Sequence, residues 1–205
     1  MRIGVMQATS QREKNSMLYE CTKLAAKDAE VVNFGVFPDE NASISYIETA
    51  VGACLLLASG AVDFVVTGCS SGQGMMLAMN SLPGVLCGYL PTPSDAFLFG
   101  RINGGNAASL SLGLGCGWLG ELNMQDTLNR LFDGEFGCGY PPEEAERKRA
   151  DTLRLKAINA SVKRPLAEAL PLLNRELVKK ALSRVYDYIC EHGRSETVEL
   201  LEKYR

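Results

Sequence analysis

The chain has few of the residues on which metal, disulfide and nucleic-acid sites depend. It contains one histidine, His192, and seven cysteines, among which no C-x-x-C pair occurs. An odd number of cysteines without paired spacing argues against a disulfide framework and the common zinc motifs. The formal net charge is −3, so a surface for nucleic acid or an anionic membrane is not expected. No apolar run approaches the ~20 residues of a membrane-spanning helix.

The thiols and the first residues indicate a reducing compartment. Most cysteines stand inside apolar runs, where a free thiol behaves as a small core residue. The apolar stretch Met1–Met6 is too short for a signal peptide. We therefore expect a cytoplasmic protein that acts on a small molecule, with no nucleic-acid or membrane partner.

Strand-like and helix-like apolar patterns alternate over the first two thirds of the chain. Strands are expected at residues 2–6, 30–34, 62–67, 84–89 and 107–112, and helices at 15–27, 46–59, 74–80, 94–101 and 123–132. This alternation predicts an α/β fold, a Rossmann-like doubly wound parallel sheet of about five strands. Such sheets bind ligands beyond the carboxyl ends of their strands.

The composition changes after Phe136. The breaker cluster Gly137–Pro142 precedes a charged, helix-prone segment, with helices expected at 143–158, 166–172, 176–191 and 195–204. We therefore divide the chain into a sheet domain, residues 1–136, and a helical C-terminal extension, residues 137–205. The extension is too polar to form its own core, so it should pack on the sheet domain or on a partner subunit.

One thiol stands in a glycine-rich loop between the third expected strand and the next helix. The loop reads Gly68-Cys69-Ser70-Ser71-Gly72-Gln73-Gly74. A helix N-terminus carries partial positive charge and unpaired N–H groups, which stabilise a thiolate. Gly72 and Gly74 let backbone N–H groups approach an oxyanion without obstruction by side chains. A thiolate base beside such donors suits proton transfer between adjacent sugar carbons.

Other interpretations of Cys69 fit the sequence less well. A phosphatase loop needs Arg six positions after the Cys, where this chain has Met75. A Cys–His protease needs a histidine partner, and His192 lies in the extension. The loop also lacks the Lys and the spacing of a nucleotide-binding P-loop. The plain alternative is a small core residue, but the surrounding Gly and Ser residues favour a functional role.

Three segments together resemble one enzyme family. They are the Cys69 loop, Asn80-Ser81-Leu82-Pro83-Gly84 and Ile102-Asn103-Gly104-Gly105-Asn106. Over about residues 1–150, their order resembles the family of ribose-5-phosphate isomerase B and galactose-6-phosphate isomerase. The resemblance implies an aldose–ketose isomerase with a Rossmann-like fold, without metal or organic cofactor. It also implies a homodimer, or a homotetramer built from dimers, with active sites between subunits.

The same resemblance implies the roles of individual residues. Cys69 corresponds to the family's base, and Ser71 to a Thr that helps to hold the substrate. The loop amides at Gly72 and Gly74 would stabilise the enediolate oxygens. The remaining positions expected to bind the sugar substrate are Ser10, Gln11, Asn103 and Asn106.

Two departures from the family pattern bear on the substrate. The family's ring-opening His is replaced by Ile102, and its early Asp-His pair by residues near Thr9-Ser10-Gln11. These features and the longer chain resemble a branch that includes isomerases of a 4-deoxy-5-keto-hexuronate. An open-chain substrate has less need of a ring-opening His, and one Arg can hold a carboxylate. We favour a uronate, while a sugar phosphate such as ribose 5-phosphate remains open.

Several assignments stay open. Arg12 and Arg101 are both candidate carboxylate ligands, and the arginines at 147, 149 and 154 do not align clearly with the family's phosphate-binding pair. Asn103 and Asn106 flank two glycines, so a turn explains them as well as a ligand does.

Two aromatic residues and one rival function complete the expectations. Tyr46 and Trp118 should mainly contribute packing.

The rival hypothesis is a non-catalytic sugar-binding or regulatory module on the same fold, motivated by the missing histidines. Proton exchange from solvent into a bound sugar would separate the two, because a binding module gives none.

Overall fold

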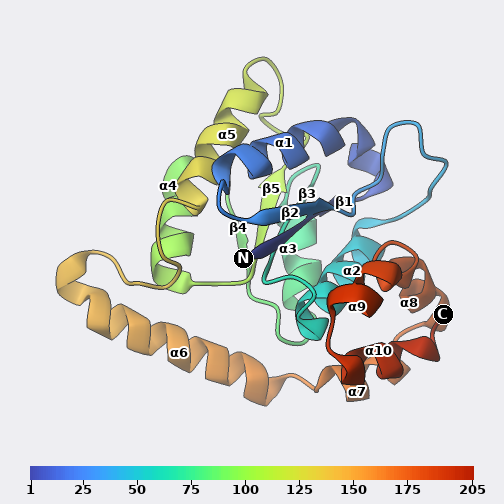
Figure 1. The fold of residues 1–205 in the computed structure, drawn as a ribbon. Coiled ribbons are helices and arrows are strands. Elements are labelled where there is room, and N and C mark those ends of the chain that lie inside the picture. Colours follow the sequence, from blue (N-terminus) through green and yellow to red (C-terminus); the bar gives the residue numbers. More distant parts are fainter.

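A five-stranded parallel sheet forms the centre of the protein in the computed structural model, which describes residues 1–205 (Figure 1). The strands are β1 Arg2–Gln7, β2 Glu30–Asn33, β3 Phe64–Cys69, β4 Cys87–Tyr89 and β5 Ala107–Ser111. They are ordered β2-β1-β3-β5-β4, and every neighbouring pair is parallel. The predicted α/β, Rossmann-like fold class is therefore confirmed. The order of strands changes direction between β1 and β3, which is where such sheets bind ligands.

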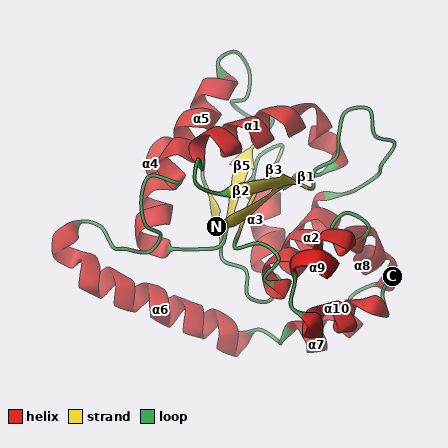
Figure 2. Cartoon of the chain, in the orientation of Figure 1, coloured by secondary structure: helices red, strands yellow, loops and turns green.

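Helices cover both faces of the sheet (Figure 2). One face carries α1 Asn15–Ala25, α4 Pro93–Leu98 and α5 Gly120–Leu131, and the other carries α2 Tyr46–Ser59 and α3 Gln73–Asn80. Successive strand residues point to opposite faces, so Val66 packs with the first group and Val65 with the second. Each face thus has its own apolar core, as expected for a buried parallel sheet.

Several boundaries differ from those expected. A 3-10 helix, η1 Thr9–Lys14, follows β1 where a loop was expected, and α4 ends at Leu98 and continues as a π-turn, Phe99–Asn103. The fourth strand begins at Cys87 instead of Gly84. Its expected first residues are held by a side chain, because Asn106 accepts from the N–H of Leu86 and donates to the carbonyl of Gly84, both at 2.8 Å.

The second half of the extension packs on α2. A turn at Pro142–Glu144 leads into α6 Ala145–Val162, and then follow α7 Leu166–Ala169, a turn at Leu170–Leu172, α8 Arg175–Leu182, α9 Tyr186–His192 and α10 Ser195–Glu202. Leu170, Leu182, Ile189 and Leu201 are buried in the same apolar cluster as Leu55 of α2. None of the helices combines the length and hydropathy needed to cross a membrane.

α6 behaves differently from the rest of the extension. It runs along the outside of the molecule (Figure 1), and its apolar side chains Leu153, Ile158 and Val162 are exposed. The expected single helix over 176–191 is also wrong in one respect: the chain breaks it at residues 183–185, between α8 and α9.

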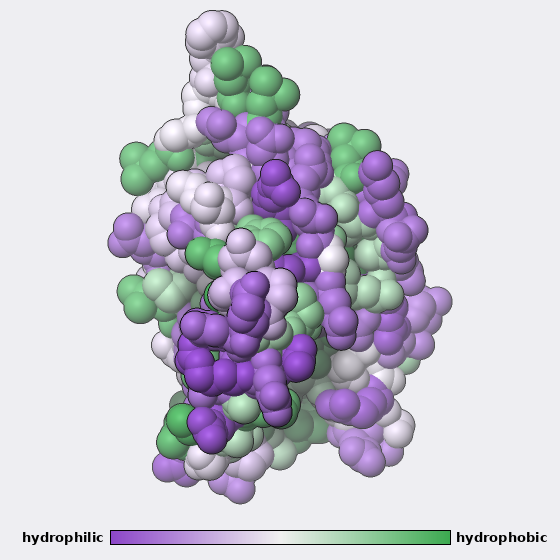
Figure 3. Space-filling view, turned by 90° about the vertical axis from the view of Figure 1, so that its left-hand side faces the viewer, coloured by the Kyte–Doolittle hydropathy of each residue, from purple (hydrophilic) through white to green (hydrophobic).

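Hydrophobic side chains also gather on the loop between β5 and α5. This loop projects from the top of the molecule (Figure 1), and Figure 3 shows apolar atoms there. Leu114 and Trp118 of the loop and Leu122 of the first turn of α5 are exposed, Trp118 by 94%. The expectation that Trp118 contributes packing is therefore wrong within one chain.

Arg101 has a structural role instead of the ligand role considered for it. Its side chain is buried and donates to the carbonyl of Leu131 at 3.1 Å and to the carbonyl of Asp133, at the end of α5. The guanidinium also lies 5.5 Å from the ring centre of Phe136. Burial is the main cause that lowers the pKa of Arg101. The candidate carboxylate ligand Arg101 is therefore corrected to a cap on the last carbonyls of α5.

We expect Arg101→Met to lower the free energy of unfolding by about 2–4 kcal/mol, because the buried carbonyl of Leu131 and the partly buried carbonyl of Asp133 lose a charged donor. Arg130→Met is the matched control at the same helix end. Arg130 is exposed and pairs with Asp133 at 3.2 Å, so its loss should change the free energy by less than about 0.5 kcal/mol. Urea unfolding followed by circular dichroism measures both, and equal effects would contradict the role given to Arg101.

Candidate functional site

The Cys69 loop leaves the sheet at the carboxyl end of β3. Cys69 is the last residue of the strand and pairs in register with Ser111 of β5. Gly68 allows this close pairing, because a Cβ there would lie 2.8 Å from the Cγ of Leu112. The thiol is therefore placed just beyond the sheet, half-buried, at the entrance to α3.

The loop turns its carbonyl groups inward. The carbonyl of Ser70 accepts from the hydroxyl of Ser111 at 3.0 Å, and the carbonyl of Gly72 accepts from the hydroxyl of Ser109 at 2.6 Å. Gly72 has a φ of 77°, a left-handed conformation that glycine adopts without strain, and it caps α3. The N–H groups of Ser71, Gln73 and Gly74 donate to no acceptor within the chain. Such a set of free N–H groups at a helix start can bind an anion.

Cys69 is less buried than the core thiols Cys54 and Cys87. Burial raises the pKa of Cys54 to about 12 and that of Cys87 to about 12, so both stay protonated at neutral pH. Cys69 is half-buried instead, and its Sγ lies 4.0 Å from the position of a Cβ at Gly74. It is therefore a thiol next to the free N–H groups of the loop.

Two further elements reach the same edge. Gln11 of η1 donates from Nε2 to the hydroxyl of Ser70 at 2.8 Å, and Ser10 is exposed on the same short helix. A Cβ at Gly74 would lie 3.7 Å from Cε2 of Tyr46, the first residue of α2. The structure therefore brings six of the predicted site residues to one edge: Ser10, Gln11, Cys69, Ser71, Gly72 and Gly74.

Tyr46 was missed as a site residue, since the sequence indicated only packing. Its side chain is 43% exposed and stands beside the Cys69 loop. The start of α2, and with it the place of Tyr46, could have been predicted from the sequence, because Ser45 and Glu48 have the spacing of a capping box. In the structure Ser45 accepts from the N–H of Glu48, and Glu48 accepts from the N–H of Ser45. A helix start after a strand lies at the carboxyl edge of a parallel sheet, which is the edge that binds ligands.

Asn103 and Asn106 lie at the opposite edge of the sheet. The carbonyl of Asn106 accepts from the N–H of Val65 at 3.0 Å, near the beginning of β3. Cys69 is four positions further along the strand than Val65, a span of roughly 13 Å. Asn103 is exposed, whereas the amide of Asn106 already holds Leu86 and Gly84. Within one chain these two residues therefore do not meet the substrate that Cys69 would bind.

One cavity at this edge is lined by residues outside the Cys69 loop. A hollow of about 300 Å³ lies between the ends of β4 and β5 and the start of α5, lined by Leu90, Thr92, Ser111, Leu114 and Asn123 among others. No group of three or more His, Cys, Asp or Glu side chains is arranged to hold a metal ion.

Comparisons with known proteins agree with this architecture. The family model described as Ribose/Galactose Isomerase matches residues 3–141. A solved 4-deoxy-L-threo-5-hexosulose-uronate ketol-isomerase, in complex with a tartrate, is 36% identical over 100% of this chain and 99% of its own, with a TM-score of 0.94. A ribose-5-phosphate isomerase from Vibrio parahaemolyticus is 38% identical, with the same coverage of both chains and the same TM-score.

Shorter proteins share the fold alone. A type B ribose 5-phosphate isomerase from Trypanosoma cruzi is 22% identical with a TM-score of 0.66, and it matches 78% of this chain but 99% of its own. The family model likewise ends at residue 141, so it leaves most of the C-terminal extension unmatched. With the family model covering more than half of the sequence, the chain belongs to the ribose/galactose isomerase family and is an aldose–ketose isomerase.

Proposed function

We propose that the enzyme interconverts an aldose and a ketose through a cis-enediolate, with Cys69 as the base. The observation that supports this most directly is the half-buried thiol next to the unpaired N–H groups of Ser71, Gln73 and Gly74. A base and fixed donors at one point are what an enediolate reaction requires.

The chemical steps follow from this arrangement. The thiolate of Cys69 takes the proton from C2, and the electrons of that C–H bond form the C1=C2 double bond while O1 becomes negative. The loop N–H groups and the hydroxyl of Ser71 stabilise the charge on the oxygens. Cys69 then returns its proton to C1. In balance, one proton moves from C2 to C1 and one from O2 to O1, so no oxidant or reductant is needed.

We further propose a 4-deoxy-5-keto-hexuronate as the substrate. This sugar has no hydroxyl at C4 and a ketone at C5, so neither position can close a furanose or pyranose ring on C1. A ring-opening group is therefore unnecessary, in agreement with Ile102 at the family's His position. Two full-length relatives carry different substrate names, a hexuronate and ribose 5-phosphate, so the choice rests on this chemical argument.

Arg12 is the cation that we propose for the carboxylate. It lies on η1, one residue after Gln11, and its Nε and Nη1 donate to the carbonyls of Thr9 and Glu40 at 3.3 and 3.1 Å. Its Nη2 makes no bond within the chain and can donate to an acid group. Lys14 on the same helix already donates to the carbonyl of Cys116 at 3.3 Å.

A partner subunit would complete the site. We propose a cytoplasmic homodimer in which Asn103 of one chain approaches Cys69 of the other, because one chain holds them at opposite edges. The exposed apolar residues of α6, Leu153, Ile158 and Val162, also call for a covering surface. Two such dimers could pair into a tetramer without changing the sites.

Replacing Cys69 with Ala should lower turnover by about 10²–10⁴-fold, the usual contribution of a general base, without a large change in stability. Cys54→Ala is the control, because this buried thiol has a raised pKa and should affect stability more than turnover. Turnover is followed by ¹H NMR in D₂O. Near-normal turnover and solvent exchange in Cys69→Ala would contradict the mechanism, and no exchange in the native enzyme with any sugar would favour a binding module.

Mixing two impaired variants should restore activity if sites are shared. Each proposed site takes Cys69 from one chain and Asn103 from the other, so a dimer of two Cys69→Ala chains, or of two Asn103→Ala chains, has no intact site. Random pairing gives half mixed dimers, each with one intact site, so activity should reach about a quarter of the native value. No recovery in mixtures refolded together would contradict a shared site, as would a monomer at micromolar concentration in light scattering.

The preferred substrate should be the uronate. We expect kcat/KM for a 4-deoxy-5-keto-hexuronate to exceed that for ribose 5-phosphate by about 100-fold or more, because a single Arg suits a carboxylate better than a phosphate dianion. Millimolar phosphate should inhibit only weakly. A clear preference for ribose 5-phosphate would overturn this assignment and leave the role of Cys69 intact.

A further inference from the structure

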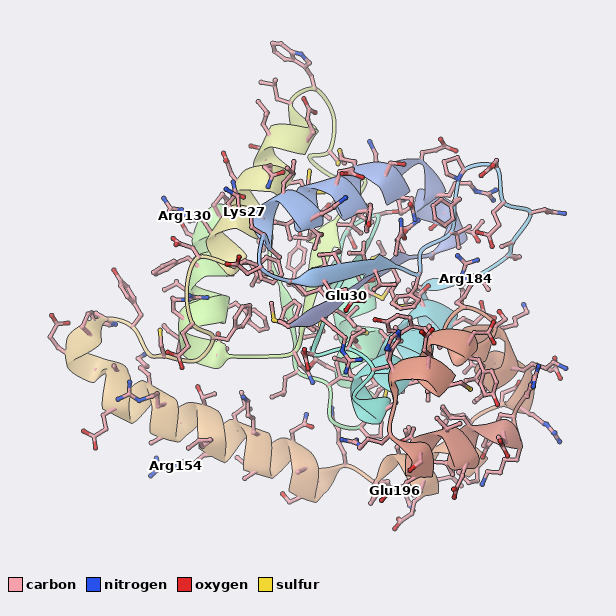
Figure 4. All side chains as sticks on the ribbon, viewed as in Figure 1. Lys27, Glu30, Arg130, Arg154, Arg184 and Glu196 are labelled. Atoms are coloured by element: carbon pink, nitrogen blue, oxygen red, sulfur yellow. The ribbon has the colours of Figure 1, made fainter.

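Arg184 in the C-terminal extension is bound to the loop that follows β2. It stands in the break between α8 and α9, and its side chain is 16% exposed. Nε donates to the carbonyl of Phe34 at 3.2 Å, Nη2 donates to the carbonyl of Gly35, and Nη1 pairs with the carboxylate of Glu40. Figure 4 labels Arg184 where the extension meets this loop. Three bonds from one guanidinium fix the loop more firmly than a single ion pair does.

The loop in turn holds η1, the helix beside the Cys69 loop. Arg12 of η1 donates to the backbone carbonyl of Glu40, the residue whose carboxylate Arg184 binds. Thr9 binds the loop on either side of Ser43, since its hydroxyl donates to the carbonyl of Ala42 and accepts from the N–H of Ile44, both at 2.9 Å. Through Gln11, η1 touches Ser70 next to Cys69. A short series of hydrogen bonds thus joins Arg184 to the proposed site.

The same loop ends at Tyr46. The capping box of Ser45 and Glu48 fixes the first turn of α2, and Lys180 of α8 lies 3.4 Å from the carboxylate of Glu48. The extension therefore contacts the loop itself at Phe34–Glu40 and, through Glu48, the first turn of α2 that follows the loop. The arginine and the lysine that make these contacts, Arg184 and Lys180, lie beyond the family model, which ends at residue 141.

We propose that Arg184 is a positioning residue for substrate binding. It holds the loop over residues 34–45 so that Arg12 and Tyr46 stand at the rim of the Cys69 site. This inference rests on the proposed function, in which Arg12 binds the acid group of the substrate. Arg184 itself does not touch the substrate. Its contribution should appear in binding of the acid group, which is present in both the bound substrate and the transition state.

Arg194 provides a matched comparison within the extension. It also donates to a backbone carbonyl, that of Ala58, near the end of α2. The first residue of α2 stands beside Cys69 and its last residue, Ser59, is thirteen positions further, about 20 Å along the helix. Arg194→Gln should therefore remove a bond between the extension and α2, a single and exposed one, without any effect on substrate binding.

The test compares Arg184→Gln and Arg194→Gln in the full-length enzyme. With a 4-deoxy-5-keto-hexuronate, Arg184→Gln should raise KM by about tenfold and change kcat by less than about threefold. Arg194→Gln should leave both near the native values. Arg184→Lys should recover only part of the loss, because an ammonium cannot reach three acceptors in one plane. Equal KM values in the two Gln variants would overturn the inference.

A second measurement does not depend on activity. Hydrogen exchange of the backbone amides over residues 37–45 should become about tenfold faster in Arg184→Gln and stay unchanged in Arg194→Gln. If the native enzyme isomerises neither hexuronate nor ribose 5-phosphate, the proposed function fails, and with it the role in substrate binding. Unchanged exchange in Arg184→Gln would overturn the loop anchor even in an active enzyme. If Arg184→Gln does not fold, Glu40→Gln, which keeps the loop's backbone contacts, serves for both measurements.

Discussion

Parallel strand pairing decides which residues of this protein can work together. Because all five strands run the same way, segments that follow strands meet at one edge and segments that precede strands meet at the other. Cys69 ends β3 and η1 follows β1, so both lie at the carboxyl edge. Asn106 precedes β5 and lies at the amino edge. No rotation of side chains spans the length of a strand, and the shared site between two chains that we propose satisfies this constraint.

The sequence predicted the sheet and the Cys69 edge because their signals are local. Apolar runs bounded by glycine predict strands, and a Gly/Ser loop before a helix predicts a nest of N–H groups whatever lies around it. Because Asn103 comes before a predicted strand, the sequence also places it at the amino ends of the strands. The distance between Asn103 and Cys69, however, depends on the pairing of β3 with β5, which the hydrophobic periodicity does not reveal. Arg101 was misjudged for a similar reason: a guanidinium that caps a helix and one that binds a ligand look the same in sequence.

The composition of α2 explains why the extension packs where it does. After Glu48 this helix has no charged residue, and buried side chains occur all around it, among them Val51, Cys54 and Leu55. A helix that is apolar on every side needs cover on its outer face as well as on the sheet. Leu170, Leu182 and Ile189 provide that cover. The break at residues 183–185 was not predictable from helix periodicity, because the contacts found there, of Arg184 with Phe34, Gly35 and Glu40, are distant in sequence.

Near Gln11 this chain lacks the family's early Asp-His pair, and this limits the chemistry that the carboxyl edge of the sheet can perform. A neutral amide can orient the hydroxyl of Ser70, as Gln11 does, but it cannot accept or release a proton at neutral pH. Ser71 offers a hydroxyl, and Arg12 a guanidinium that donates hydrogen bonds and has no acceptor. The thiol of Cys69 is then the group of this loop to which we assign proton exchange with carbon. A single base suits a substrate that is already open, because such a substrate requires proton transfer at two adjacent carbons and no prior step at a ring oxygen.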